Sequence, residues 1–131
     1  MHRLLQPPNW QKPKGYVNGV ACQGTQIYIG GQVGWNRDQK FETNDFLGQL
    51  EQTLKNIKEV LNVGGAGPEH MVRMTWYVVK KDLYVKNLKE IGVIYRNVLG
   101  KNFPAMSCVF VNGLVEDEAL LEIEVTAVIP N

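Results

Sequence analysis

The feature that most constrains this fold is an excess of apolar strand segments over the helices available to cover them. Only two segments have helical periodicity, whereas the strand-like runs carry apolar side chains on both of their faces. Ile27 and Ile29 flank Tyr28, and Val109 and Val111 alternate with Met106, Cys108 and Phe110. Two helices cover one face of such a sheet, and the other face would be a large exposed apolar patch. The sequence therefore predicts self-association of sheet face against sheet face.

The clearer helix is predicted to begin after Asn44 or Asp45, since either side chain can accept a hydrogen bond from the first-turn amides. Its apolar residues recur at spacings of three and four: Phe46, Leu47, Leu50, Leu54, Ile57 and Leu61. Gly64 and Gly65 follow, as expected at a helix C-terminus. One apolar stripe therefore faces the sheet.

The remaining segments complete an α+β pattern. Residues 1–15 are predicted to form an irregular arm, because prolines and Gly15 interrupt regular structure there. The expected elements are a hairpin of Val17–Cys22 and Gln26–Gly31 with Gly24-Thr25 as its turn, a strand Met71–Val79, one helix from about Leu83 to Leu99, and strands Met106–Asn112 and Leu120–Val128. The order β-β-α-β-α-β-β over residues 1–131 predicts one domain, a single sheet with both helices on one face.

Composition excludes several classes of protein. The chain has 131 residues, of which 44% are hydrophobic and 21% charged, as in ordinary globular proteins. No apolar run reaches the length of a membrane span. The 14 basic and 13 acidic residues nearly cancel, which argues against a dedicated nucleic-acid binder. No secretory signal is evident, so we expect a cytoplasmic protein with reduced Cys22 and Cys108, and no metal ligand set.

Two glutamates carry the most direct chemical signal. Glu122 and Glu124 lie two residues apart on the last predicted strand, so both point away from the face of Leu121 and Ile123. A carboxylate brought into an interface must be paired, hydrogen-bonded or protonated. Two interpretations remain. The glutamates supply a general acid/base or water-orienting group, or they have only a structural place, in an interface salt bridge or on a solvated edge.

Other candidates have equally plain structural alternatives. Met106, Cys108 and Phe110 share one strand face and are expected in the same cleft as the glutamates, although packing alone explains them. Gly30-Gly31 permits close approach of a ligand to the backbone, or marks a bulge. Tyr16 either contacts a ligand or covers the sheet edge.

Several segments together resemble the RidA/YjgF family of imine and enamine deaminases. The matching segments, in order, are Gly15–Val20, Ile29–Gly34, Leu50–Lys58 with its following double glycine, Phe103–Val109 and Leu121–Val125. The resemblance implies a chorismate-mutase-like fold and a homotrimer with ligand clefts between subunits. It also implies hydrolysis of small imines such as 2-aminoacrylate without metal or organic cofactor. Some family members are described instead as endoribonucleases or translation inhibitors.

By position, the resemblance assigns four roles. Glu122 corresponds to the glutamate that orients the attacking water, and the backbone amide of Cys108 to the group that holds the substrate carboxylate. Gly31 corresponds to the cleft glycine and Tyr16 to the tyrosine at the cleft mouth. Placing a water beside an electrophilic iminium carbon is the main catalytic demand.

Three family positions differ here. Met106 replaces the deaminase arginine, Gly30 replaces a serine, and Gly92 lies near the position of an asparagine. Loss of an arginine fork that holds a carboxylate costs about 2–5 kcal/mol. The sequence therefore favours a larger or less anionic imine, such as an aminomuconate, with Arg73 as a possible replacement cation. A non-catalytic ligand-binding trimer is the alternative, and an RNA-cleaving protein is favoured least.

Overall fold

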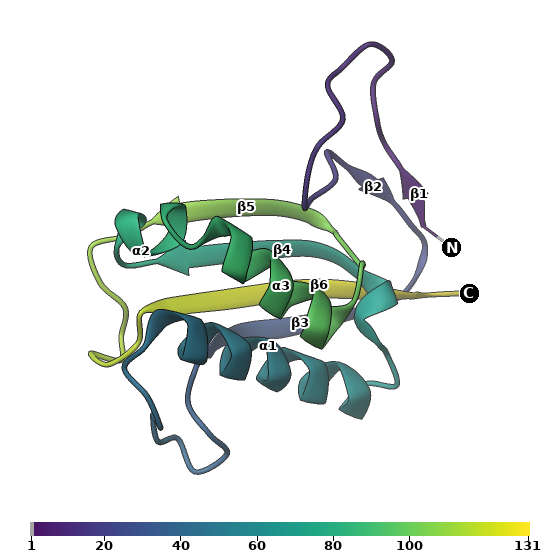
Figure 1. Cartoon of the computed structure of the whole chain (residues 1–131). Helices are drawn as coiled ribbons and strands as arrows, with labels where there is room; N and C mark the ends of the chain where they lie inside the picture. Colours follow the sequence, from purple (N-terminus) through teal and green to yellow (C-terminus); the bar gives the residue numbers. More distant parts are fainter. Residues whose placement is uncertain (1) are drawn as a thin grey trace.

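The computed structural model describes residues 2–131 and contains one four-stranded sheet in the order β3-β6-β4-β5. The strands are β3 (Gly24–Val33), β4 (Met71–Val78), β5 (Ala105–Phe110) and β6 (Leu121–Pro130). β6 pairs antiparallel with β3 and β4, and β5 lies parallel to β4. The central position of β6 places Glu122 between two neighbouring strands (Figure 1).

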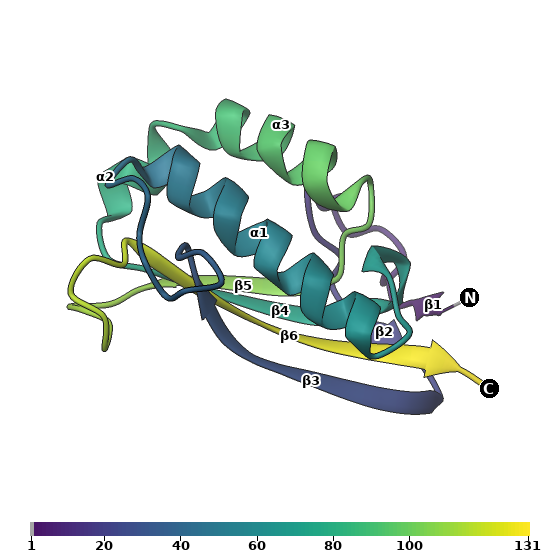
Figure 2. The same cartoon turned by 90° about the horizontal axis from the view of Figure 1, so that it is seen from below.

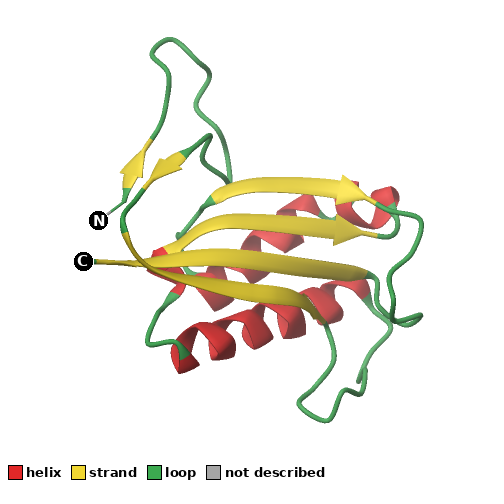
Figure 3. Cartoon of the chain, turned by 180° about the vertical axis from the view of Figure 1, so that it is seen from behind, coloured by secondary structure: helices red, strands yellow, loops and turns green. Residues whose placement is uncertain are grey.

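The helices cover one face of this sheet and leave the other open. α1 (Phe46–Val63) and α3 (Leu88–Leu99) lie side by side over the strands, and the short α2 (Lys81–Val85) precedes α3 (Figure 2). A single-turn 3-10 helix, η1 (Pro68–His70), leads into β4. Figure 3 shows the opposite face, on which no helix lies. The α+β architecture with helices on one face is confirmed.

The core forms where the predicted apolar stripes meet. In α1, Leu50, Leu54, Ile57 and Leu61 are fully buried. They pack against the alternate β6 residues Leu121, Ile123, Val125 and Ala127, which are also buried. Asp45 caps α1 by accepting a hydrogen bond from the Gly48 amide at 2.9 Å. Helix periodicity and strand alternation were therefore predicted correctly at this interface.

The predicted N-terminal hairpin is wrong. β2 (Val20–Ala21) pairs with β1 (Arg3–Leu4), which lies in the arm expected to be irregular, and the two form a separate small sheet (Figure 1). Gly24 and Thr25, expected as the turn, are instead the first residues of β3. Gly24 has φ +147° and lies against the backbone of Ile129, so it turns the chain into the main sheet rather than back on itself.

Two smaller expectations also change. The second predicted helix is divided into α2 and α3, with Asn87 preceding α3 at its N-cap position.

The open face is more polar than expected. Cross-strand pairing and alternation place on it Tyr28, Arg73, Thr75, Tyr77, Ser107, Val109, Glu122, Glu124 and Thr126. A largely apolar second face was therefore a wrong prediction, because Met106, Cys108 and Phe110 turn toward the helices.

Candidate functional site

Glu122 is held at a β-bulge by the backbone of Gly31. The register between β3 and β6 shifts by one residue between Ile29 and Gln32, so Gly30-Gly31 forms a bulge beside the carboxylate. A methyl group added to Gly31 would lie 2.6 Å from Glu122 Cδ and closer still to Oε2. Glycine is therefore the residue that lets this carboxylate rest against the strand. The sequence-predicted Gly31 and Glu122 are brought together.

The start of β6 is fixed by a buried amide that sequence reasoning did not single out. Gln49, on α1, is fully buried. Its Nε2 donates to the carbonyls of Thr43 and Glu118 at 3.1 and 2.9 Å, and its Oε1 accepts from the Leu120 amide at 2.9 Å. These bonds join both loops to α1 and set the position of β6 two residues before Glu122. The sequence signal that could have indicated this residue is a glutamine next to the apolar stripe of α1.

Glu124 has a different environment from Glu122. Tyr77, on β4, donates its hydroxyl to Glu124 Oε1 at 2.7 Å. This hydrogen bond raises the pKa of Tyr77, with burial and the charges of the two glutamates adding to it and Arg73 opposing it. Within residues 2–131, Glu122 has no side-chain hydrogen bond and no ion pair with a lysine or arginine. Of the two carboxylates, Glu122 is therefore the one left free to bind water.

Beside the glutamates, the open face is hollowed over β3, β6 and β4. A shallow pocket of 330 Å³ is lined in part by Tyr28, Gly30, Arg73 and Glu124. Gly30 thus opens onto the pocket, while its neighbour Gly31 contacts Glu122. The structure places Arg73 on the same face as the glutamates.

Met106, Cys108 and Phe110 do not share this face. They lie beside Met74, Trp76 and Val78 of β4, which are buried under the helices. Because residues paired across strands point to the same side, these three side chains turn toward the helical layer. The expectation that they share a cleft face with Glu122 is therefore wrong within this chain, whereas the backbone of Cys108 stays on the edge strand.

The Cys108 thiol is part of an aromatic cluster. Tyr84 packs edge-on against Trp76 and Phe110, with ring centroids 6.1 and 6.0 Å apart respectively. Burial raises the pKa of Cys108 to about 11, and a hydrogen bond with Tyr84 only partly opposes this. At neutral pH the group is a thiol rather than a thiolate, so it is a poor nucleophile.

Tyr16 lies at the outer edge of the sheet. Its neighbour Val17 forms a parallel bridge with Ala105, and the Val17 amide donates to the Pro104 carbonyl at 3.1 Å. The exposed Tyr16 residue therefore lies beside the start of β5, where Ala105 precedes Met106. Glu122 lies opposite Tyr77, toward the other end of the strands. The predicted residues therefore fall into two separate groups.

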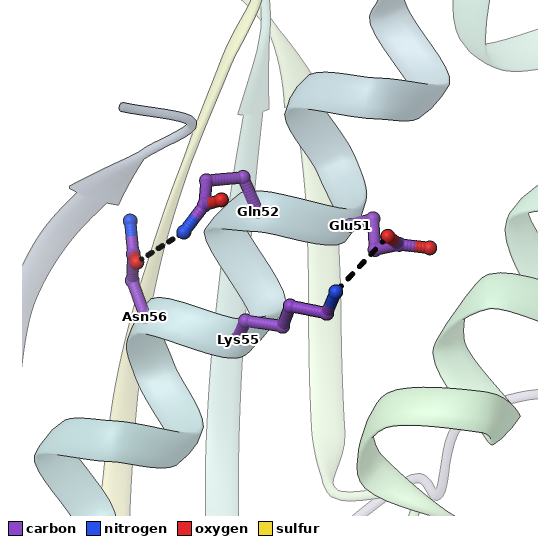
Figure 4. A network of polar contacts seen from close by, with 4 residues as sticks. All are labelled: Glu51, Gln52, Lys55 and Asn56. Atoms are coloured by element: carbon purple, nitrogen blue, oxygen red, sulfur yellow. Dashed lines mark hydrogen bonds and ion pairs between the residues drawn. The ribbon is translucent and has the colours of Figure 1, made fainter. Parts of the chain in front are cut away.

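The loop between β3 and α1 is held by a polar network on the helix. Asn56 Nδ2 donates to the carbonyls of Val33 and Trp35 at 3.0 and 2.8 Å. Figure 4 shows the other bond of this amide, in which Asn56 Oδ1 accepts from Gln52 Nε2 at 2.8 Å. A neighbouring ion pair joins Lys55 and Glu51 at 3.2 Å. This network keeps the chain following the bulge in place.

Among residues 2–131, no three His, Cys, Asp or Glu side chains gather as a metal site would require. No helix in the same range is long and apolar enough to cross a membrane. The fold and site thus define an α+β protein with a free carboxylate at a β-bulge on its open sheet face.

Comparison with known proteins places this chain in a family. Residues 10–129 match the family described as Endoribonuclease L-PSP. A RutC family protein, UK114 of Drosophila melanogaster, is 29% identical, with 97% of this chain and 89% of that protein covered. A 2-iminobutanoate/2-iminopropanoate deaminase of Dermatophagoides farinae is 28% identical, with 93% and 97% covered. The chain belongs to this family, the RidA/YjgF proteins.

A solved structure supports the same assignment. YyfB of Yersinia pestis, a protein of unknown function in the conserved Rid family, is 32% identical to this chain. The two superpose with a TM-score of 0.82, and 98% of each chain is covered. The predicted family resemblance is therefore confirmed.

Proposed function

We propose that this protein hydrolyses a reactive imine or enamine to a carbonyl compound and ammonia. The observation that carries the proposal is the Glu122 carboxylate, half-buried against Gly31 and without a cationic partner in the described residues. The relative from Dermatophagoides farinae, named as an imine deaminase, supports the reaction class. Glu122 is the proposed catalytic residue.

The reaction needs one water and one proton carrier. An enamine first takes a proton on carbon and becomes an iminium ion. Glu122 accepts a proton from water as the water oxygen bonds to the iminium carbon, which gives a carbinolamine. The same carboxyl group returns that proton to nitrogen, the C–N bond breaks, and the nitrogen leaves as ammonia. The hydroxyl proton goes to solvent as the carbonyl forms. The iminium carbon is already electrophilic, so placing the water is the main requirement.

The substrate is proposed to be larger or more apolar than 2-iminobutyrate, with an aminomuconate as one example. The residue in the family's arginine position, Met106, is half-buried and packs toward the helices. A thioether cannot form the paired charged hydrogen bonds that hold a carboxylate. Gly30, in the place of a serine, removes a further polar contact and opens onto the pocket.

The site is proposed to be completed by another copy of the chain. In one protomer, Tyr16 and Met106 are at the edge of β5, whereas Gly31 and Glu122 are on β3 and β6. A homotrimer, which the family resemblance implies, would bring the edge of one copy to the bulge of the next and form clefts between them. Light scattering tests this assembly, and a monomer at micromolar concentration would contradict it.

A second candidate function is a trimer that binds a small apolar ligand without turnover. The replacement of the family arginine by Met106 favours it, since a carboxylate anchor is then missing. A third candidate, cleavage of RNA, has less support because the net charge is only +1. RNA binding that weakens steeply with salt is the least that it requires.

The deciding experiment is the release of ammonia from freshly generated 2-aminoacrylate and 2-iminobutyrate, measured above the spontaneous rate. The wild type, Glu122→Gln, Met106→Arg and the matched control Glu124→Gln are compared. We expect Glu122→Gln to abolish turnover and Glu124→Gln to keep most of it. A silent wild type rescued by Met106→Arg indicates a catalytic frame adapted to another imine. If neither the wild type nor Met106→Arg releases ammonia above the spontaneous rate, the result favours the ligand-binding trimer.

A further inference from the structure

Arg73 is a charged side chain for which the fold provides no partner. It is the single lysine or arginine within the four strands of the main sheet, and its side chain is exposed on the open face. Among the described residues, no carboxylate lies within ion-pair distance of it. An arginine with a free guanidinium offers a planar fork of donors that matches a carboxylate.

This arginine lines the 330 Å³ pocket on the open face. Thr75 and Thr126 contribute hydroxyl groups, Tyr28 contributes an exposed ring, and Gly30 leaves the backbone of β3 accessible. Glu124 lines the pocket as well, with one oxygen already bound to Tyr77. The pocket therefore presents a cation and a carboxylate, and Glu122 lies outside its lining, two residues before Glu124 on the same face of β6.

The register sets the distance between Arg73 and Glu122. Arg73 lies opposite Thr126, four residues beyond Glu122 on β6. At about 3.3 Å per residue, the two backbone positions are about 13 Å apart along the strand. The α-carboxylate of an imino acid is on the carbon next to the reacting carbon. The two side chains cover part of this distance, and a carboxylate several bonds from the reacting carbon spans more of the remainder than the α-carboxylate does.

We propose that Arg73 binds a distal carboxylate of the substrate and so selects imines or enamines that carry a second acid group several bonds from the reacting carbon. This inference rests on the proposed deaminase function and names the substrate class.

The test compares two imines made in place by an L-amino-acid oxidase: 2-iminoadipate, with a distal carboxylate, and 2-iminobutyrate, without one. Arg73→Gln is compared with Arg96→Gln, which removes the same charge from an exposed residue of α3. We expect Arg73→Gln to raise KM for 2-iminoadipate at least tenfold with kcat nearly unchanged, and to change KM for 2-iminobutyrate less than twofold. Arg73→Lys should recover part of the loss, and Arg96→Gln should match the wild type.

Three results would overturn the proposal. These are equal effects of Arg73→Gln on both imines, no effect on either, or a change in oligomeric state by light scattering, which would make Arg73 a contact between copies.

Binding of 2-oxoadipate, the hydrolysis product of 2-iminoadipate, is measured by calorimetry and separates this proposal from the deaminase function. If the wild type turns over neither imine, the proposed deaminase function fails for these two substrates. A tenfold weaker affinity in Arg73→Gln then still supports the anchor, whereas an unchanged affinity rejects it.

Discussion

Replacing Gly31 with alanine tests whether the bulge positions the catalytic carboxylate. The added methyl group would lie 2.6 Å from Glu122 Cδ, against an ordinary carbon–carbon contact of about 3.5 Å, so the carboxyl group must move by about 1 Å. The group that moves is the end of a flexible side chain, and the backbone of Gly31 has no positive φ. The substitution should therefore change the geometry of the site without unfolding the protein.

The expected loss of activity follows from that displacement. A misplacement of about 1 Å at a reacting group can lower the rate about 100-fold. We expect Gly31→Ala to lower kcat/KM for a turned-over imine by that order, while the thermal midpoint changes by no more than a few degrees. Activity is read as ammonia release, and stability as thermal unfolding followed by circular dichroism.

Gly30→Ala is the matched control. A methyl group at Gly30 meets no atom within 4 Å, so Glu122 keeps its position and kcat should stay near the wild-type value, whatever the change in KM from the pocket lining. If Gly31→Ala retains wild-type activity, or if Gly30→Ala lowers kcat equally, the bulge does not position the carboxylate and the assignment of Glu122 loses its structural basis.

Three further predictions concern stability and reactivity. Gln49→Ala should lower the free energy of unfolding by about 3 kcal/mol in urea titrations, because it leaves buried backbone groups without partners. The control is Gln52→Ala, which removes one half-buried hydrogen bond and should lower the free energy of unfolding by under about 1 kcal/mol. Cys108 should be alkylated by iodoacetamide at pH 8 at least tenfold more slowly than the exposed Cys22, as read by peptide mass spectrometry; equal rates would contradict its raised pKa. Burial raises the pKa of Tyr95 above its unfolded value of 10.0, so stability should fall as pH rises through 10, and Tyr95→Phe should weaken that dependence in alkaline melts.

Features encoded within one segment could be predicted from the sequence. The α1 stripe, its Asp45 cap and the alternation of β6 depend on spacings of two to four residues, and the structure has them as predicted. The family resemblance also rests on local motifs in the correct order. Within these limits, the helical layer and the side of β6 that bears Glu122 were predictable.

Features that depend on strand pairing were not predictable in the same way. The Gly24-Thr25 pair is a turn signal, yet β2 pairs with β1 in the N-terminal arm because Gly24 turns the chain toward β6. The face of Met106 likewise depends on its register with Met74 in a parallel neighbour. Register follows from tertiary packing, and a shift of one residue moves every side chain to the other face.

The same limit explains why Glu122 and Glu124 could not be distinguished by sequence. They are identical residues on one face of one strand, and their spacing carries no information about their neighbours. Their difference comes from Tyr77 on β4, which donates a hydrogen bond to Glu124, and from Gly31 on β3, which makes room for Glu122. A bulge that adds one residue to β3 thus leaves one carboxylate free to bind water while the other is held in a hydrogen bond. The catalytic assignment therefore rests on the pairing of three strands.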